Sequence, residues 1–361
     1  MRIITRYILG ELLKPFFFGL FAFCGILLGG VLVDLIEFAG RYQLSISVLL
    51  RLFVFRIPEN VALGFPMAML LATLIGLGNM TGHSETIAMQ AGGVSFNRIA
   101  LPVLLTGLVV SSVAILVNET IVPPAKRLYN QEREQARWAL PQGVLYHYFF
   151  TDYDKDGVKR LIYAEEYYPA QERLVKVIIQ EMQNNKVKKA IFADEVLWAE
   201  DKEFWFFKEG VIYNYEGEKV LPLRMAQGNY PTGLTRTPHE VRQLALDPED
   251  MSWSELNWYI KNGSNLENVN ELRVMLHQKT SIPFASFFFA LLGLPLGLQP
   301  QRRTSSAGFG LSLVFIFIYY VLMGFGSYLG QSGILSPFIA AWIQNFILGG
   351  YGFYHFMKAA N

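Results

Sequence analysis

The chain has 361 residues, of which 52% are hydrophobic and 17% charged, and its formal net charge is +1. A charge so close to zero argues against a nucleic-acid partner, because such proteins carry a marked basic excess. The charges are unevenly placed, since residues 123–280 hold 45 of the 61 Asp, Glu, Lys and Arg residues. This distribution predicts one soluble block inserted into an otherwise apolar chain.

Six apolar runs are long enough to cross a bilayer, because a hydrocarbon core of about 30 Å needs roughly 20 helical residues. The first run is too long for the apolar region of a signal peptide and lacks a clean cleavage site, so we predict a retained helix. Arg51, Arg56 and Pro58 blur the start of the second run, and proline interrupts the fourth. The runs lie at 15–33, 57–80, 99–122, 282–298, 307–329 and 335–356.

The loop HSETIAMQAGG, residues 83–93, joins the second and third runs and predicts a short helix with both ends marked. Ser84 is a typical N-cap residue, and Glu85 adds a negative charge to the first turn. Gly92 and Gly93 are able to end the helix.

A loop between membrane helices does not need a capped helix with an acidic residue at its start. Glu85 therefore either stabilises only the dipole of its own helix, or it also contacts a cytoplasmic partner. Ile87 and Ala88 would lie on one side of this helix. The residues alone leave the two readings open.

Basic residues in short loops and tails indicate which side of the membrane each loop occupies. Seven of them fall on the side of the termini and of residues 83–93, whereas Arg41, Arg51 and Arg56 fall on the other. We therefore expect both termini and this loop in the cytoplasm, and the soluble block outside it. The seven are Arg2, Arg6, Lys14, Arg98, Arg302, Arg303 and Lys358.

The soluble block begins as a charged helical continuation of the third span, residues 123–140. From about 143 to 246, short runs rich in β-branched and aromatic residues alternate with turn sequences, which predicts an antiparallel sandwich or open barrel. Two helices are expected to follow, one capped by Ser254 and one over 267–280 that leads into the fourth span.

Motifs for chemistry are missing from the chain. There is no GxxxxGK[ST] loop for nucleotide phosphates, no GxSxG elbow, and no metal-binding spacing among the five histidines. Cys24 is the single cysteine, so no disulfide framework exists. We therefore expect a chain that is not an enzyme and that holds no metal and no cofactor of its own.

Two sets of residues have more than one reading. Lys126, Arg127 and Arg133 follow the third span and either form a solvated helix face or meet anionic lipid headgroups. Gly25 and Gly29, like the pair Gly293 and Gly297, allow helices to approach closely, either within the chain or at a subunit interface.

The chain resembles the LptF/LptG permease family (YjgP/YjgQ type), the membrane subunits of the lipopolysaccharide export transporter. The likeness covers the whole chain, and its specific parts are the SETIAMQAGG loop and the run LPLGLQPQR…GFGLSLVFIFIYY. IPENVALGFPMAMLLATLIGLGNM, NETIVPP and LDPEDMSWSELNWYI add to it, whereas the TRY start is a weak feature.

The resemblance implies a membrane protein of six transmembrane helices with an extracytoplasmic all-β jellyroll domain between the third and the fourth. On that basis residues 1–140 hold the first three helices with a cytoplasmic coupling helix near 84–92. Residues 141–247 form the periplasmic jellyroll, and 248–361 hold connecting helices and the last three transmembrane helices.

The resemblance also implies an ABC transporter of the bacterial inner membrane that serves outer-membrane biogenesis. Two such permeases pair, as a homodimer or a heterodimer, and a cytoplasmic ABC ATPase dimer that holds ATP and Mg binds their coupling helices. Lipopolysaccharide leaves the outer leaflet and passes through the jellyroll to a periplasmic bridge of similar domains. The coupling residues are then Ser84, Glu85, Ile87, Ala88, Met89 and Gly92.

Lipopolysaccharide would enter between the first and fifth spans, whose apolar walls would receive acyl chains while basic residues receive phosphates. The chain departs from the family at the outer end of the first span, where Asp34 and Glu37 stand in place of lysines. The expected wall residues are Phe16, Leu20, Phe315 and Tyr319, and the expected basic residues are Arg41, Lys126, Arg127 and Arg133, the last at a family basic position.

Two other functions remain alternatives. A lipoprotein-release or efflux type ABC permease usually has four spans, with its external domain after the first. An ATP-independent secondary lipid transporter usually needs a buried acid or histidine relay, and no such carboxylate lies deep in the third to sixth runs.

Overall fold

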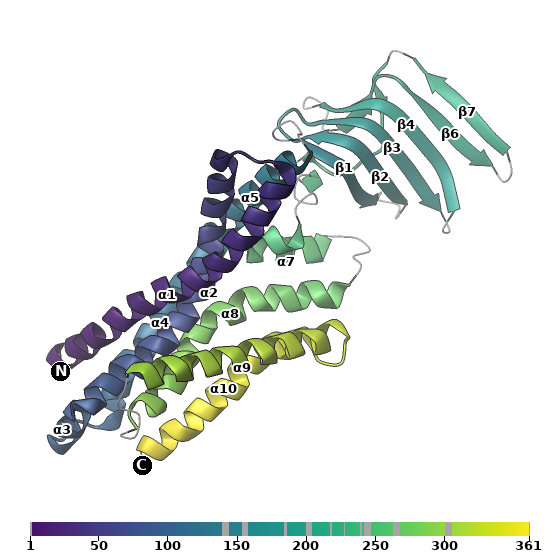
Figure 1. Ribbon diagram of the computed structural model, residues 1–361. Coiled ribbons are helices and arrows are strands. Elements are labelled where there is room, and N and C mark those ends of the chain that lie inside the picture. The colour runs from purple at the N-terminus through teal and green to yellow at the C-terminus, as the bar shows by residue number, and fades with distance from the viewer. Residues whose placement is uncertain are drawn as a thin grey trace. The chain divides into compact units, whose positions relative to one another are not determined.

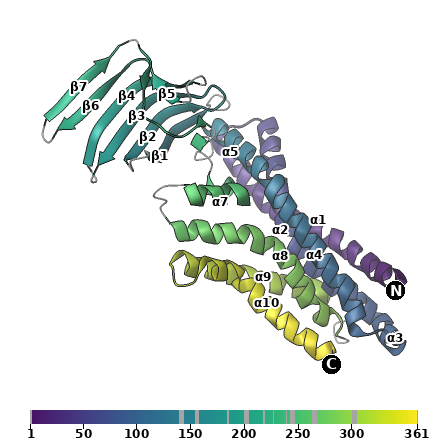
Figure 2. The same cartoon turned by 180° about the vertical axis from the view of Figure 1, so that it is seen from behind.

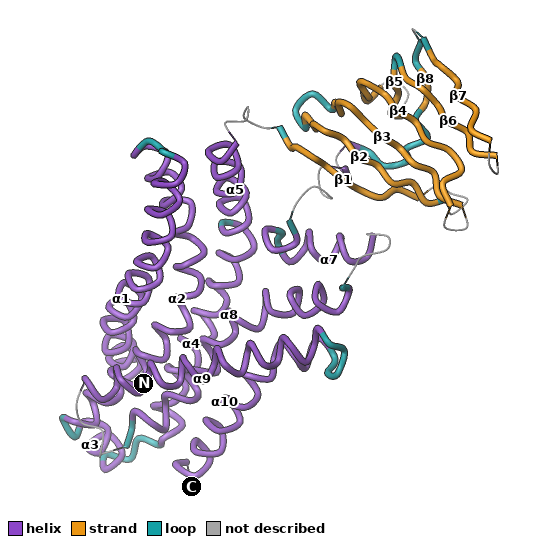
Figure 3. Tube along the Cα trace, turned by 45° about the vertical axis from the view of Figure 1, so that its right-hand side comes forward, coloured by secondary structure: helices purple, strands orange, loops and turns teal. Residues whose placement is uncertain are grey.

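The computed structural model describes residues 2–138, 144–153, 158–183, 186–199, 204–216, 219–226, 228–238, 240–241, 247–262, 268–299 and 305–360. The chain forms two compact units. One is helical and comprises 1–132, 252–257 and 268–361, and the other comprises 133–251 and 258–267 and holds a β sheet. Figure 3 shows helices in the first unit and strands in the second.

The helical unit is built from long helices joined by short turns. Both termini and α3 lie at the same end of this unit (Figures 1 and 2). The described helices of the chain are α1 (Arg2–Tyr42), α2 (Ile46–Gly82), α3 (Glu85–Ala91), α4 (Phe96–Thr120), α5 (Val122–Trp138), α7 (Trp253–Asn262), α8 (Val269–Gly297), α9 (Ser305–Gln331) and α10 (Pro337–Ala360), with a 3-10 turn, η2 (Pro248–Asp250), before α7. η2 and the C-terminal parts of α5 and α7 belong to the second unit.

Among the described residues, five helices are long and apolar enough to cross a membrane: α1, α2, α4 with the adjoining α5, α8 and α9. They correspond to five of the six predicted spans. The sixth run forms α10, a helix of 24 residues, which is not among the five. Gln344, Asn345 and His355 lower its mean hydropathy, so the six-span count remains a prediction.

The second span begins earlier than the sequence suggests. Arg51 and Arg56 lie inside α2, which starts at Ile46 and also contains Pro58 and Pro66. Proline lacks an amide hydrogen but is tolerated in membrane helices where neighbouring helices compensate.

The helices differ strongly in how much of them the chain itself covers. In the most apolar stretch of each, 78% of α2 and 72% of α8 is buried, against 22% of α1 and 11% of α9. α2 and α8 pack against each other, and each also packs against α4 and α9. They form the centre of the unit, so α1 and α9 present apolar side chains outward.

Close helix packing depends on glycine at a few positions. A Cβ on Gly76 of α2 would lie 2.8 Å from the backbone oxygen of Glu11 in α1. A Cβ on Gly293 or Gly297 of α8 would clash with Thr73 of α2, so that pair serves packing within the chain. Gly25 of α1, in contrast, faces open space.

The second unit contains eight described strands in one antiparallel sheet. The short antiparallel strands are confirmed, whereas the sandwich, barrel or jellyroll form stays a prediction. The order is β1-β2-β3-β4-β5-β8, and β6 pairs with both β4 and β7. The strands are β1 (Leu145–Tyr153), β2 (Lys159–Tyr168), β3 (Arg173–Gln183), β4 (Lys186–Ala199), β5 (Phe204–Phe207), β6 (Gly210–Glu216), β7 (Lys219–Met225) and β8 (Tyr230–Pro231).

The edges of this sheet are unequal. β1 is a nine-residue edge strand without proline. β7 is an edge strand that pairs only with β6 and carries Pro222 at its middle, and β8 is two residues long and ends in Pro231.

The segment after β8 is hydrogen-bonded to side chains of the sheet's apolar core. Tyr148 donates to the backbone oxygen of Val241 at 2.5 Å, and Trp205 donates to that of Arg236 at 2.8 Å. Burial raises the pKa of Tyr148 well above its ordinary value, so the phenol remains a donor. Buried Asp152 accepts from the backbone and the hydroxyl of Thr235, both at 2.8 Å. These bonds hold the segment against the core.

Candidate functional site

The short helix α3 lies between α2 and α4, and its start differs from the prediction. Ser84 occupies the N-cap position, but its backbone is left-handed, with φ of 61°, and its side chain makes no capping hydrogen bond. A capping side chain needs an extended backbone, whereas the abrupt turn from α2 into α3 imposes the left-handed one. The prediction of Ser84 as a side-chain cap is therefore wrong.

The end of α3 is a Schellman motif built on the two glycines. Gly93 has φ of 84°, a conformation in which glycine carries no steric penalty. Its amide donates to Gln90 at 2.9 Å, and the amide of Val94 donates to Met89 at 3.0 Å. Gly92 is the C-cap, so the helix ends where the sequence predicts.

Glu85 contacts a helix that sequence reasoning did not connect with it. The hydroxyl of Tyr7, near the start of α1, donates a hydrogen bond of 2.8 Å to Oε2 of Glu85. The two residues are 78 positions apart, and no local sequence feature links them. Glu85 therefore joins the first helix of the chain to the short loop helix.

α3 has an inner and an outer side. Thr86 is buried, and its hydroxyl is 3.2 Å from that of Thr81, while Met89 packs against the core of the unit. Ile87 is 52% exposed and Ala88 is exposed beside it. The outer side is thus small and apolar, with the Glu85 carboxylate at one end.

Three of the four basic residues predicted to meet lipid phosphates are paired with carboxylates of the chain itself. Arg41 forms an ion pair of 2.9 Å with Glu37, one turn earlier in α1. Lys126 lies 3.0 Å from Glu59, and Arg127 pairs with Glu255 of α7. Arg133 is exposed on α5.

The partner of Lys126 also holds α2 and α5 together. Glu59 accepts from Arg56 at 2.5 Å, and the Arg56 guanidinium lies 5.0 Å from the ring centre of Tyr129. Both side chains in the Lys126–Glu59 pair are less than a quarter exposed. The charge of Lys126 is thus compensated inside the chain, and its contact with lipid headgroups stays a prediction.

The start of α7 is attached to the end of α4. The Glu119 carboxylate accepts from the backbone amides of Trp253 at 2.7 Å and Ser254 at 3.2 Å. It also accepts from the Ser254 hydroxyl at 2.8 Å. These amides belong to the first turn of a helix, where no intrahelical acceptor is available. Ser254 therefore lies inside the helix and is not its cap.

The cap of α7 is Ser252, in a reciprocal capping box with Glu255. The Ser252 hydroxyl accepts from the Glu255 amide at 3.2 Å, and Glu255 accepts from the Ser252 amide at 2.8 Å. Burial raises the pKa of Glu255, but the Ser252 amide and the Arg127 guanidinium together hold it below its usual value. This capping box can be predicted from the sequence, because SWSE matches the capping pattern S-x-x-E.

Replacing Glu119 by alanine is expected to loosen α7. The change leaves two first-turn amides without their acceptor, and loss of such a cap costs about 1 kcal/mol. Hydrogen exchange of the purified full chain should show faster exchange over 253–256. Glu134→Ala, an exposed carboxylate on α5, is the matched control, and equal protection in both variants would contradict the attachment.

The residues expected to line an apolar cavity are mostly covered by the chain itself. Phe16 is 7% exposed and stacks with Phe65 at 6.3 Å between ring centres. Tyr319 is 3% exposed and packs edge-to-face against Phe289. Leu20 and Phe315 are partly buried. In this arrangement Phe16 and Tyr319 stabilise the helical unit and offer little surface to a ligand.

The chain is similar to known export proteins along almost its whole length. The family model for lipopolysaccharide export system permease LptF/LptG matches residues 6–358. The permease protein LptG of that system from Escherichia coli K12 is 25% identical over 277 residues, which is 74% of this chain and 73% of that protein. Its counterpart from Haemophilus influenzae is 23% identical over 290 residues, covering 77% and 76%.

Proposed function

Because this chain belongs to the LptF/LptG family of lipopolysaccharide export permeases, we propose that it is a transmembrane subunit of an ABC transporter that extracts lipopolysaccharide. The lipid leaves the outer leaflet of the bacterial inner membrane. A separate cytoplasmic ATPase dimer supplies the energy and holds ATP and Mg. The chain itself is a transport subunit without enzymatic activity, cofactor, metal or nucleic-acid partner.

The observation that carries this proposal is the geometry of α3. It is a stiff turn of helix, fixed by a Schellman motif and by the inward side chains of Thr86 and Met89. Its outer side offers Ile87 and Ala88 beside the Glu85 carboxylate. A rigid, exposed helix of this kind suits the role of a coupling helix, because force from a partner reaches the membrane helices only through a rigid element.

We expect force applied to α3 to reach α1 as well. Glu85 is hydrogen-bonded to Tyr7, so a partner that binds α3 also acts on the first membrane helix. α1 and α9 are the helices that the chain covers least. A second permease of the same family faces these two helices, and lipopolysaccharide enters sideways between them.

The β unit continues the path of the lipid as a periplasmic jellyroll. We expect its inner apolar face to open and shield acyl chains, and its edge strand β1 to accept a strand of a bridge protein of similar fold. Both termini and α3 then lie in the cytoplasm, on the side that the basic residues indicate.

Two features favour this function over the alternatives. The sheet is inserted after α4, the third span, rather than after the first as in lipoprotein-release permeases. Among the described residues of the helical unit, the fully buried polar side chains are neutral, such as Asn60, Thr73 and Asn345. A proton-driven transporter needs an ionisable group there.

The test is purification of the tagged chain in mild detergent with its native neighbours co-expressed, followed by mass spectrometry of bound protein and lipid. We expect an ABC ATPase and lipopolysaccharide to co-purify with it. A folded, dispersed chain that carries neither would overturn the proposal in favour of a secondary transporter.

A further inference from the structure

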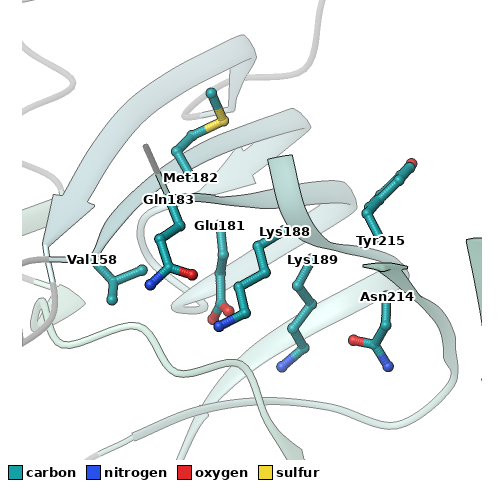
Figure 4. A pocket seen from close by; sticks show the side chains of 8 residues that line it. All are labelled: Val158, Glu181, Met182, Gln183, Lys188, Lys189, Asn214 and Tyr215. Carbon is teal, nitrogen blue, oxygen red and sulfur yellow. The ribbon is translucent and has the colours of Figure 1, made fainter. Parts of the chain in front are cut away.

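A cavity of about 230 Å³ lies at one end of the β sheet, beside the ends of β3, β4 and β6 (Figure 4). Its lining includes Glu181, Lys188, Lys189 and Asn214. This is the end of the strands away from Leu145, where the chain enters the sheet, since Leu145 pairs with Tyr167 at the opposite end of β2.

An irregularity in the sheet brings the two lysines together. Glu181 pairs with Lys189 and Met182 with Val187, so Lys188 is an extra residue of β4 without a partner in β3. Neighbours in a regular strand point to opposite faces, whereas a bulge re-aims one of them. In Figure 4 both lysine side chains point to the same side as Glu181, and Met182 points away.

The two lysines lie on the face of the sheet that carries its apolar core. Lys189 pairs with Asn214, and two residues further along Ile191 pairs with Ile212 and with Ile179. Residues two apart share a face, and these isoleucines are buried. The cavity therefore lies on the same face of the sheet as the apolar core.

Among the described residues that line this cavity, positive charge exceeds negative charge. Its acid, Glu181, is neutralised by Arg160 at 2.9 Å, and the Arg160 side chain is only 8% exposed. Among the described residues, no carboxylate pairs with Lys188 or Lys189. Two ammonium groups and an amide thus face one space with their hydrogen bonds available. Phosphate oxygens are strong acceptors for such donors.

We propose that Lys188, Lys189 and Asn214 form a subsite for a phosphate group, and that its source is the headgroup of the exported lipid. This identification of the source rests on the proposed function, since free phosphate has the same chemistry. Lys126 and Arg127 are paired within the chain at partly buried positions, and Arg41 forms an exposed pair with Glu37. On this proposal cations of the β unit hold the headgroup, on the face of the sheet that carries its apolar core.

The test uses the purified full-length chain with a photo-reactive benzoylphenylalanine in place of Gln183, which lines the same cavity. Lipopolysaccharide is cross-linked to it, and so is the same lipid after chemical removal of its phosphates. For Lys188→Glu/Lys189→Glu we expect cross-linking to fall by about ten-fold or more, because two charge-assisted contacts are lost. For the chain with unaltered lysines, removal of the lipid phosphates should lower cross-linking by a similar factor.

Two control variants separate charge at the site from charge in general. Lys188→Arg/Lys189→Arg should retain cross-linking. Lys208→Glu/Lys261→Glu changes the total charge equally at exposed positions outside the cavity, and should also retain it. Matching thermal unfolding of all variants excludes misfolding as the cause of a lost signal.

Two results would overturn the subsite: unchanged cross-linking in the double glutamate variant, and equal cross-linking of the dephosphorylated lipid. Loss of the signal on addition of millimolar inorganic phosphate would keep the phosphate subsite but overturn the lipid headgroup as its occupant, because free phosphate would displace it. In each case co-purification of an ATPase and lipopolysaccharide would leave the proposed function standing, so the two failures are distinguishable.

Discussion

Replacing Glu85 by arginine is expected to abolish binding of the partner ATPase and to lower lipid transport by at least about ten-fold. The change removes the one acidic group on α3 and places a positive charge at a helix N-terminus, where it is unfavourable by about 0.3–1 kcal/mol. The larger effect falls on the partner, because a charge at a protein interface that loses its complement costs several kcal/mol. The measurement is ATPase co-purification together with lipid release from membrane vesicles.

Tyr7→Phe is the control that separates two roles of Glu85. It removes only the hydrogen bond between α1 and α3, which is worth about 0.5–1.5 kcal/mol. We expect this variant to keep the ATPase bound while its transport falls by a smaller factor. If Glu85→Arg retains the ATPase at the unaltered level, α3 is not the coupling helix.

Gly76→Val is expected to destabilise the contact between α1 and α2 strongly. Its Cβ would lie 2.8 Å from the backbone oxygen of Glu11 and 3.2 Å from Leu12. A backbone oxygen cannot turn aside, so α1 and α2 must separate, and overpacking of this kind costs about 1–3 kcal/mol. Scanning fluorimetry in detergent should show a midpoint lower by several degrees.

Gly25→Val is the matched control for this substitution. Gly25 lies in the same pair of helices, but nothing is within 4 Å of its Cβ position. Its midpoint should stay at the value of the unaltered chain. An equal fall in both variants would mean that valine destabilises through lost helix propensity and not through the contact of α1 with α2.

The sequence predicts the helices and strands well where apolar length or alternation decides them. It leaves the start of α2 open, because Arg51 and Arg56 interrupt the apolar run. In the folded chain Arg51 pairs with Glu132 and Arg56 with Glu59. The partner of Arg51 is 81 residues away. No local pattern reveals that it is available to compensate a charge within the helix.

The candidate site likewise combines features that the local sequence determines with features that require the tertiary fold. The end of α3 follows from its two glycines, whose conformational freedom is a local property. The left-handed backbone of Ser84 does not follow from the local sequence, since the short connection between two long helices determines it. The hydrogen bond from Tyr7 and the attachment of α7 to Glu119 both require the tertiary fold. The capping box of Ser252 and Glu255, in contrast, could be read from spacing alone.

The inequality of the sheet edges gives any assembly through this domain a direction. Among the described edge strands, β1 is the longest and contains no proline, whereas β7 and β8 each lose one amide hydrogen to proline. A partner that adds a strand at β1 therefore finds no equivalent second position on the same sheet. Two sheets that meet through β1 alone would form a closed two-fold pair, whereas a different strand added at β1 makes a heterologous contact. In either case the sheet has no second edge of the same kind, so this chain would stand at an end of the assembly and not within a continuous array.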